Sequence, residues 1–211
     1  FTIVLSAQMK KQFCIISFLL VLLYCGCNKV NYYPDDPVPF DHTILLSHHG
    51  EKDSLSRENT FEACVKALED YEGLEVDVQI SKDHTLWLSH SSDVTYCGGA
   101  TTCFVETTDK EIESISTCDG EDISYTKLEE VMSYMDENNI RKPLSIDIKG
   151  WVPCNGETLD IEGEMRLEAE KAISLAEQYH LIDNLLIENE LPSVLHFAKQ
   201  QNEKVQTFLY S

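Results

Sequence analysis

The stretch "GLEVDVQISKD", Gly73–Asp83, decides how this chain is expected to fold. Apolar and polar residues alternate along it, so one face of a strand carries valine and isoleucine and the other carries Glu75, Asp77 and Gln79. Side chains two positions apart on a strand point the same way. Two carboxylates therefore lie side by side, and like charges that close repel each other unless a positive group lies between them. The stretch indicates a strand that needs a positive partner.

Strand-like and helix-like segments alternate around this stretch. Further strands are expected at 43–49, 85–90, 143–150, 184–189 and 205–211, and helices at 58–71, 127–139, 164–180 and 191–202. Strands that alternate with helices imply a parallel sheet with helical crossovers. Such a sheet either stays open and doubly wound or closes into a (β/α)8 barrel.

The barrel is favoured by where the reactive side chains fall. The first strand is not followed by a glycine-rich phosphate-binding loop, which argues against a dinucleotide-binding fold. Candidate site residues instead stand at or near the carboxyl ends of four strands, the active face of a barrel: His48, Glu75, Asp77, His90, Asp147 and Lys149. Six strands are predicted where a barrel needs eight. The sequence thus predicts a barrel truncated at its C-terminus, with an acidic, turn-rich insertion at about 91–126 after the third strand.

The start of the chain reads as an export signal. We expect residues 1–8 to be a non-native extension and 9–27 to be a lipoprotein signal peptide, because two lysines precede an apolar run at 13–24 that is shorter than a membrane span. Gly26 and Cys27 resemble a lipoprotein cleavage site, with Cys27 as the lipidated residue. A plain secretory signal is the alternative. The localisation expected is an exported bacterial lipoprotein, anchored to the membrane and facing the periplasm or the cell exterior.

Residues 28–42 contain three prolines and are expected to be a tether, and 43–211 to be the folded domain. After export, five cysteines remain: Cys64, Cys97, Cys103, Cys118 and Cys154. An odd number leaves at least one without a partner in the chain. Cys97 and Cys103 flank a turn and are placed to bridge. Their spacing, without a second cysteine pair or a histidine, argues against a zinc site there.

The net charge excludes one class of partner. The chain has 16 Lys and Arg against 37 Asp and Glu, a formal net charge of −21. Nucleic-acid binding needs a basic surface, so no nucleic-acid partner is expected.

A cation site and an acid–base pair can be assembled from the strand ends. Glu75, Asp77 and Asp147 offer oxygen ligands of the kind that Ca²⁺ and Mg²⁺ prefer, with Lys149 on the same face as Asp147. Imidazole titrates near working pH, so His48 and His90 on one face favour acid–base catalysis. A hard cation and a lysine offset charge on phosphate oxygens. The set favours phosphodiester cleavage.

The motifs "SHHG", "ENTFEA", "GLEVDVQISKD", "LWLSH" and "LSIDIK" together resemble the glycerophosphodiester phosphodiesterase family, within the superfamily of phospholipase C-like phosphodiesterases. The resemblance covers about Ile44 to Gly150. It implies a metal-dependent barrel hydrolase that releases sn-glycerol 3-phosphate and an alcohol. It also implies His48 as base and His90 as acid, and Lys149 as a phosphate contact.

Two positions depart from the family pattern. His49 stands where the family usually has an arginine that contacts phosphate, and Ser91 stands where an aspartate usually follows the second histidine. We therefore assign His49 to substrate binding. Two alternatives remain: a phospholipase-like or other phosphodiesterase of the same superfamily, and an inactive surface lipoprotein that binds phosphodiesters. The expected partners are a small glycerophosphodiester and, through the lipid anchor, a membrane; the sequence does not predict an oligomeric state.

Overall fold

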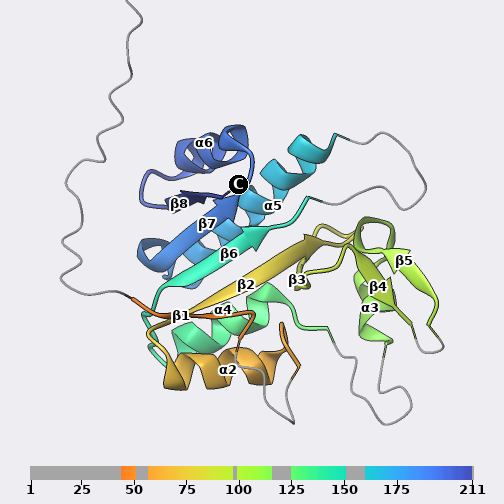
Figure 1. Ribbon diagram of the computed structural model, residues 1–211, viewed down its shortest axis with the longest axis horizontal. Coiled ribbons are helices and arrows are strands. Elements are labelled where there is room, and N and C mark those ends of the chain that lie inside the picture. The colour runs from red at the N-terminus through yellow and green to blue at the C-terminus, as the bar shows by residue number, and fades with distance from the viewer. Residues whose placement is uncertain (1–43, 51–56, 97–98, 116–124, 151–159, 211) are drawn as a thin grey trace, which may run out of the picture. The chain divides into compact units, whose positions relative to one another are not determined.

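The structure is a computed structural model, and it describes residues 44–50, 57–96, 99–115, 125–150 and 160–210. In chain order the elements are β1 (Leu46–His48), α2 (Phe61–Asp70), β2 (Gly73–Ile80), β3 (Leu86–Leu88), β4 (Asp93–Thr95), β5 (Thr101–Cys103), η1 (Phe104–Glu106), α3 (Asp109–Glu113), α4 (Leu128–Glu137), β6 (Leu144–Ile148), α5 (Ile161–Gln178), η2 (Ile182–Asn184), β7 (Leu185–Asn189), α6 (Pro192–Gln201) and β8 (Gln206–Leu209). Figure 1 shows them around one central sheet.

The sheet confirms the predicted α/β class. Its five parallel strands follow the order β1-β2-β6-β7-β8, and β3 joins β2 as a sixth strand. The successive strands β6, β7 and β8 lie side by side, as in a barrel wall, but in the described residues the sheet is open, with β1 and β8 at its edges. The large apolar side chains of Phe208 and Leu209 on β8 are about half exposed.

The third strand was predicted wrongly as a member of the parallel set. β3 pairs antiparallel with β2, and Val78 lies opposite Leu88. The reason is the short "SKDHT" connection, Ser81–Thr85, which leaves no room for the helical crossover that a parallel connection requires. The chain therefore folds back along β2, and this reversal positions the segment that follows β3.

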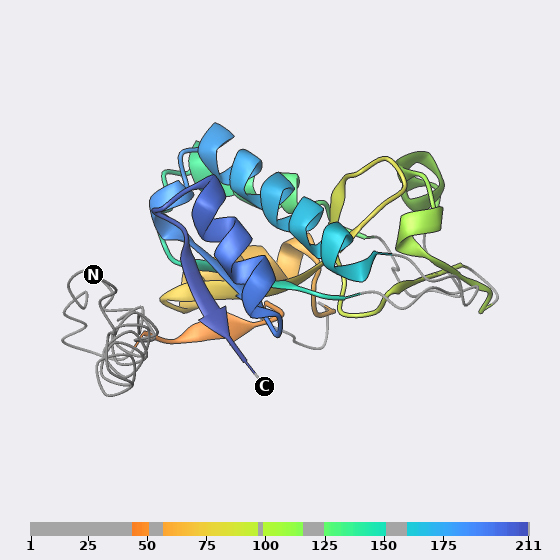
Figure 2. The same ribbon diagram turned by 90° about the horizontal axis from the view of Figure 1, so that it is seen from above.

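The helices cover the sheet with apolar stripes. In α4 the buried residues recur every three or four positions, at Leu128, Val131, Met132 and Met135, the spacing of one helical face. Each such buried side chain contributes about 1.5–3 kcal/mol relative to exposure. Figure 2 shows α5 and α6 side by side along one face of the sheet. Thr60 caps α2, since its side chain accepts a hydrogen bond from the Ala63 N–H. None of the helices in the described ranges is both long enough and apolar enough to cross a membrane.

The predicted insertion forms a small unit of its own, made of β4, β5, η1 and α3. Its core is built around Trp87, Val94, Phe104, Ile112 and Ile115. Cys103 is disulfide-bonded, but the pairing expected with Cys97 lies outside the described residues. The predictions for the extension at 1–8, the signal at 9–27, the lipidated Cys27 and the tether at 28–42 also concern residues outside the described ranges.

Asp109 at the start of α3 fixes the insertion to the β2–β3 turn. Its carboxylate accepts hydrogen bonds from the hydroxyls of Ser81 and Thr85 and from Nε1 of Trp87. Burial opposes the charged form, but these hydrogen bonds outweigh it and lower the pKa of Asp109. A group with a lowered folded-state pKa stabilises the fold above its unfolded-state pKa and loses that contribution as the pH falls.

We expect Asp109→Ala to lower the free energy of unfolding by about 2–3 kcal/mol at neutral pH, because three donors lose a charged acceptor. The deficit relative to wild type should shrink below about pH 4, where the carboxyl is protonated in the unfolded chain. Urea titrations at pH 7 and pH 3.5 measure both. Asp70→Ala, which removes an exposed ion pair with Lys66, is the control and should cost less than about 0.5 kcal/mol. An equal cost for the two variants would contradict the role of Asp109.

Candidate active site

The register of the parallel strands brings the predicted site residues together. His48 on β1 lies opposite Glu75 on β2, and Asp77 on β2 lies opposite Asp147 on β6. The carboxylates of Glu75, Asp77 and Asp147 each offer an oxygen within 4.8 Å of the others, and all three residues are buried. The convergence of these three acids was predicted from the sequence and is confirmed in the geometry.

A left-handed turn at the end of β1 places two neighbouring histidines on one side. Successive side chains on a strand normally point to opposite faces. His49 has a φ of 59° and Gly50 one of 80°, and the strand ends there. As a result the imidazole rings of His48 and His49 stack, with centroids 3.6 Å apart. His49 also donates its backbone N–H to Oε2 of Glu75 at 2.9 Å.

His49 is bound to the acids rather than open to solvent. Its Nε2 lies 2.8 Å from Oδ2 of Asp77, and its Nδ1 lies 3.9 Å from a carboxylate oxygen of Glu58. A carboxylate only accepts, so Nε2 carries the proton and the neutral ring keeps its lone pair on Nδ1. Burial lowers the pKa of His49, although the charge of Asp77 partly opposes this.

Asn59 joins the histidine turn to β2. Its backbone N–H donates to the carbonyl of His49 at 2.8 Å. Its side-chain amide donates to Oδ2 of Asp77 at 2.9 Å and accepts from the Asp77 N–H at 3.3 Å. The left-handed φ of 57° at Asn59 is one that asparagine tolerates better than most residues. The sequence analysis includes Asn59 only within the motif "ENTFEA", so its part in holding Asp77 was missed.

Lys149 places a positive charge between two of the acids. Its Nζ lies 2.9 Å from Oδ1 of Asp77 and also forms a hydrogen-bonded ion pair with Asp147. Burial would lower the pKa of Lys149, but its hydrogen bonds to the two carboxylates raise it well above its usual value. The positive partner that the β2 sequence demands is, in the folded chain, the ammonium group of Lys149. The sequence analysis placed Lys149 on the same strand face as Asp147 but gave it only the role of contacting the phosphate group.

Among the residues that the structure describes, no lysine or arginine pairs with Glu75, and Nε2 of His48 lies 3.9 Å from its Oε2. Burial raises the pKa of Glu75 to about 8, and the charges of Asp77, Glu188 and Asp147 add to this against the opposing hydrogen bond from His49. The raised pKa of Glu75 means that its ionised form lacks a compensating positive charge. A hard divalent cation would supply that charge, and the three buried carboxylates offer the oxygen ligands that such an ion takes.

The raised pKa of Glu75 has a consequence for stability without metal. Between the ordinary pKa of 4.5 and the folded value of about 8, the native chain binds a proton that the unfolded chain lacks. The free energy of unfolding therefore falls as the pH rises through this range, by at most about 1.4 kcal/mol per pH unit for one proton.

We expect Glu75→Gln to flatten this decline, because the amide does not titrate. Thermal melts in EDTA between pH 5 and pH 8 should show wild type losing more stability than the variant. Glu69→Gln, a change at an exposed position on α2, should follow wild type. Parallel curves for wild type and Glu75→Gln would show that Glu75 is ionised across the range.

His90 reaches the site through the antiparallel reversal of β3. The N–H of Ser89 donates to the carbonyl of Asp77 at 3.1 Å, which holds the end of β3 beside the middle of β2. The ring of His90 then lies 5.6 Å from that of His49, centroid to centroid. The sequence placed His90 at this site, but for the wrong reason, since a parallel β3 was assumed.

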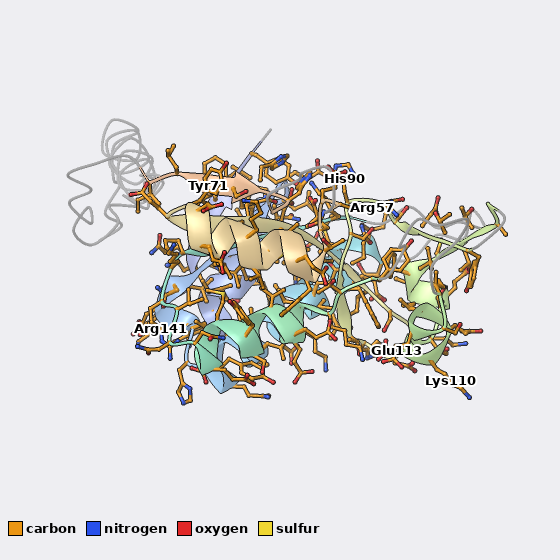
Figure 3. The ribbon with its side chains drawn as sticks, turned by 90° about the horizontal axis from the view of Figure 1, so that it is seen from below. Arg57, Tyr71, His90, Lys110, Glu113 and Arg141 are labelled. Atoms are coloured by element: carbon orange, nitrogen blue, oxygen red, sulfur yellow. The ribbon has the colours of Figure 1, made fainter. Side chains whose placement is uncertain are left out.

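A cavity of about 350 Å³ adjoins His90. It is lined by the 57–60 segment, by the end of β3 and by the insertion residues Asp93, Thr95 and Tyr125. Figure 3 shows His90 and Arg57, which share this cavity, close to each other between α2 and the insertion. Ser91 occupies the aspartate position of the family pattern, and its hydroxyl accepts from the N–H of Asp93 at 3.1 Å. In the described part of the chain, Ser91 makes no hydrogen bond to the His90 ring.

Two further residues approach the acids from later in the chain, one on β7 and one directly after β8. Glu188 on β7 lies opposite Asp147, and it accepts a hydrogen bond from the hydroxyl of Ser145. Tyr210 donates its hydroxyl to Oδ1 of Asp147 at 2.9 Å, and burial together with that bond raises the pKa of Tyr210. Glu188, like Asp147, is an acidic residue within an otherwise apolar strand, so the same sequence pattern could have identified it. Nothing in the sequence pattern singles out Tyr210.

Fold and site together define a class: a barrel-type α/β protein in which histidines and a cluster of acids that could hold a metal ion gather around neighbouring strands. The chain belongs to the glycerophosphoryl diester phosphodiesterase family, whose model matches residues 48–208. The family resemblance of the sequence motifs is thereby confirmed.

Solved structures agree with this fold. A glycerophosphodiester phosphodiesterase from Parabacteroides distasonis matches with a TM-score of 0.62 at 17% identity, covering 78% of this chain and 63% of that one. One from Thermotoga maritima matches with a TM-score of 0.55 at 24% identity, covering 79% and 61%. An Oleispira antarctica phosphodiesterase in complex with the product sn-glycerol-3-phosphate matches with a TM-score of 0.60 at 17% identity, covering 78% and 64%.

The chain spans about three fifths to two thirds of the length of the solved structures that it matches, between 59% and 66%. A search of curated proteins found no significant match.

Proposed function

We propose that this chain catalyses the hydrolysis of glycerophosphodiesters to sn-glycerol 3-phosphate and an alcohol, with a divalent cation and a histidine pair. The observation that carries the proposal is the convergence of His48 and the three acids, with His90 brought beside them by β3. Family membership over residues 48–208 and the product bound by the Oleispira relative support the choice of substrate.

The cation would be held by Glu75, Asp77 and Asp147. The oxygen donors favour Ca²⁺ or Mg²⁺ over softer ions. When bound, the ion supplies positive charge against the phosphate oxygens, where negative charge builds up in the transition state.

Lys149 would serve both the empty and the loaded site. Its ammonium is bonded to Asp77 and Asp147 in the folded chain, where it offsets their repulsion. Its side chain remains partly exposed and is long and flexible, so it can turn from the carboxylates to a phosphate oxygen. His49 would contribute at the same place through its N–H bonds to the acids, with less reach than the arginine of the family pattern.

The two histidines would move the protons. His48 takes the proton of the attacking oxygen as that oxygen bonds to phosphorus. His90 gives a proton to the alkoxide as its bond to phosphorus breaks. The cavity beside His90, lined by insertion residues, offers room for the alcohol portion of the substrate.

We also propose export and a lipid anchor at Cys27, on the signal-like sequence at 9–27. Such an anchor would bring the site close to phospholipid breakdown products. Metabolic labelling with a radioactive fatty acid, in wild type and Cys27→Ser, tests this directly.

The function is tested by incubating the 211-residue chain with glycerophosphocholine and glycerophosphoethanolamine, with Ca²⁺, Mg²⁺ or EDTA. Release of glycerol 3-phosphate that stops in EDTA supports the proposal. Hydrolysis only of other phosphodiesters, such as intact phospholipid, would favour the second reading of the sequence. Binding of glycerophosphocholine without turnover would favour the inactive lipoprotein.

A further inference from the structure

A second group of ligands overlaps the three acids. One nitrogen each from His48 and His49 and one oxygen of Glu75 lie within 4.8 Å of one another. Glu75 belongs to both groups, whereas Asp77 and Asp147 belong only to the oxygen set. The side chain of His48 is 77% exposed, so an ion from solution can reach this group directly.

The backbone positions the two imidazoles so that both can bind one metal ion. The left-handed φ at His49 turns its ring onto the side of His48, and the rings stack at 3.6 Å with an interplanar angle of 30°. Asp77 holds the His49 ring through Nε2. A carboxylate against the far nitrogen is the usual outer partner of a metal-binding histidine, since it fixes the ring and raises its basicity. The N–H bond from His49 fixes the Glu75 carboxylate in the same way.

We propose that His48, His49 and Glu75 form a second metal site, selective for zinc-class ions over Ca²⁺ and Mg²⁺. Two imidazoles and one carboxylate are a ligand set that zinc takes with a fourth position open to water. Imidazole nitrogen suits Zn²⁺, Co²⁺ and Ni²⁺, whereas Ca²⁺ and Mg²⁺ select oxygen. The residue that makes the site is His49, which stands where the family pattern has arginine.

The consequence for catalysis rests on the proposed function. An ion on His48 occupies the lone pair that the base needs, and an ion on Glu75 removes one ligand from the oxygen set. Zinc at this site therefore inhibits hydrolysis, and added Ca²⁺ or Mg²⁺ only partly relieves it, since His48 is not one of their ligands.

The test is direct binding on the full chain, independent of activity. Zn²⁺ is titrated in competition with a chromophoric chelator, and Co²⁺ is followed by its visible absorption, which intensifies in a tetrahedral site. The variants are His49→Arg, which restores the family residue, and His49→Gln, which removes the ligand without adding charge. Asp147→Asn alters the oxygen set and the contacts of Asp147 with Lys149 and Tyr210, but it changes none of the three residues of the second site. His196→Gln, at an exposed histidine on α6, is the matched control.

We expect wild type, Asp147→Asn and His196→Gln to bind one Zn²⁺ alike, and both His49 variants to bind it at least about 100-fold more weakly. Loss of an outer-shell partner alone costs 10- to 100-fold, and loss of a ligand should cost more. Unchanged zinc affinity in the folded His49→Gln protein, or zinc binding lost with Asp147→Asn, would overturn the proposal. Zinc binding with no hydrolysis of any glycerophosphodiester would leave this site standing and refute the proposed function instead.

Discussion

Asp77→Asn is expected to abolish the stabilisation that Ca²⁺ or Mg²⁺ gives to the folded chain. Asp77 is fully buried, and it is the acid that meets His49, Asn59 and Lys149 at once. A ligand that binds only the native state stabilises it by about 2.7 kcal/mol at a hundredfold excess over its Kd. For a chain of this size that is a rise in Tm of about 5–10 °C. Asparagine keeps the shape of the side chain but removes the charge that binds the cation.

Differential scanning calorimetry with EDTA, Ca²⁺ and Mg²⁺ measures the effect. The variant is also expected to be less stable without metal, because Lys149 loses one of its two carboxylate partners, so the comparison is between the two metal-induced shifts. Asp183→Asn, which removes only an exposed pair with Lys204, should keep the full shift. A metal-induced rise in Asp77→Asn equal to that of wild type would remove Asp77 from the ligand set.

The strand carrying Asp77 was the most predictable part of the molecule. Its alternation is a local signal, and parallel pairing then aligns Glu75 with His48 and Asp77 with Asp147. Residues at equivalent places on adjacent parallel strands meet whatever the rest of the chain does. For that reason the acids and His48 could be assembled from sequence alone.

The topology around His90 could not be predicted in the same way. A three-residue apolar strand gives no signal of its direction, and only the length of the turn before it does so. The five residues Ser81–Thr85 between the two strands permit a hairpin and exclude a crossover. Attention to that length would have corrected the direction of β3 without changing the place of His90.

Contacts within the site were the least predictable. That Lys149 bridges two acids depends on side-chain reach, and the contact of Tyr210 with Asp147 depends on the path of the chain after β8. The stacking of His48 on His49 depends on one backbone angle. Periodicity in a sequence reports which face a residue occupies, and none of these contacts follows from the face alone.

Replacing either His48 or His90 by alanine is expected to lower turnover of glycerophosphodiesters on the order of 10²-fold or more, the usual scale for loss of a catalytic acid or base. His48 lies across from Glu75, with its Nε2 3.9 Å from Oε2, where the attacking oxygen would meet the cation site. His90 lines the cavity that would receive the alcohol. This arrangement favours His48 as base and His90 as acid. Because one histidine must be neutral and the other charged, the wild-type pH–rate profile should be bell-shaped.

A substrate with a very acidic leaving group separates the two roles. A nitrophenyl phosphodiester needs little protonation as its bond to phosphorus breaks, so it should restore most of the rate of His90→Ala and little of the rate of His48→Ala. His180→Ala, at an exposed histidine that contacts Asp136, should turn over both substrates like wild type. Rescue of His48→Ala in place of His90→Ala would reverse the assignment. Full activity in both variants on the natural substrate would show that the two histidines are structural, and that the protons move through other groups.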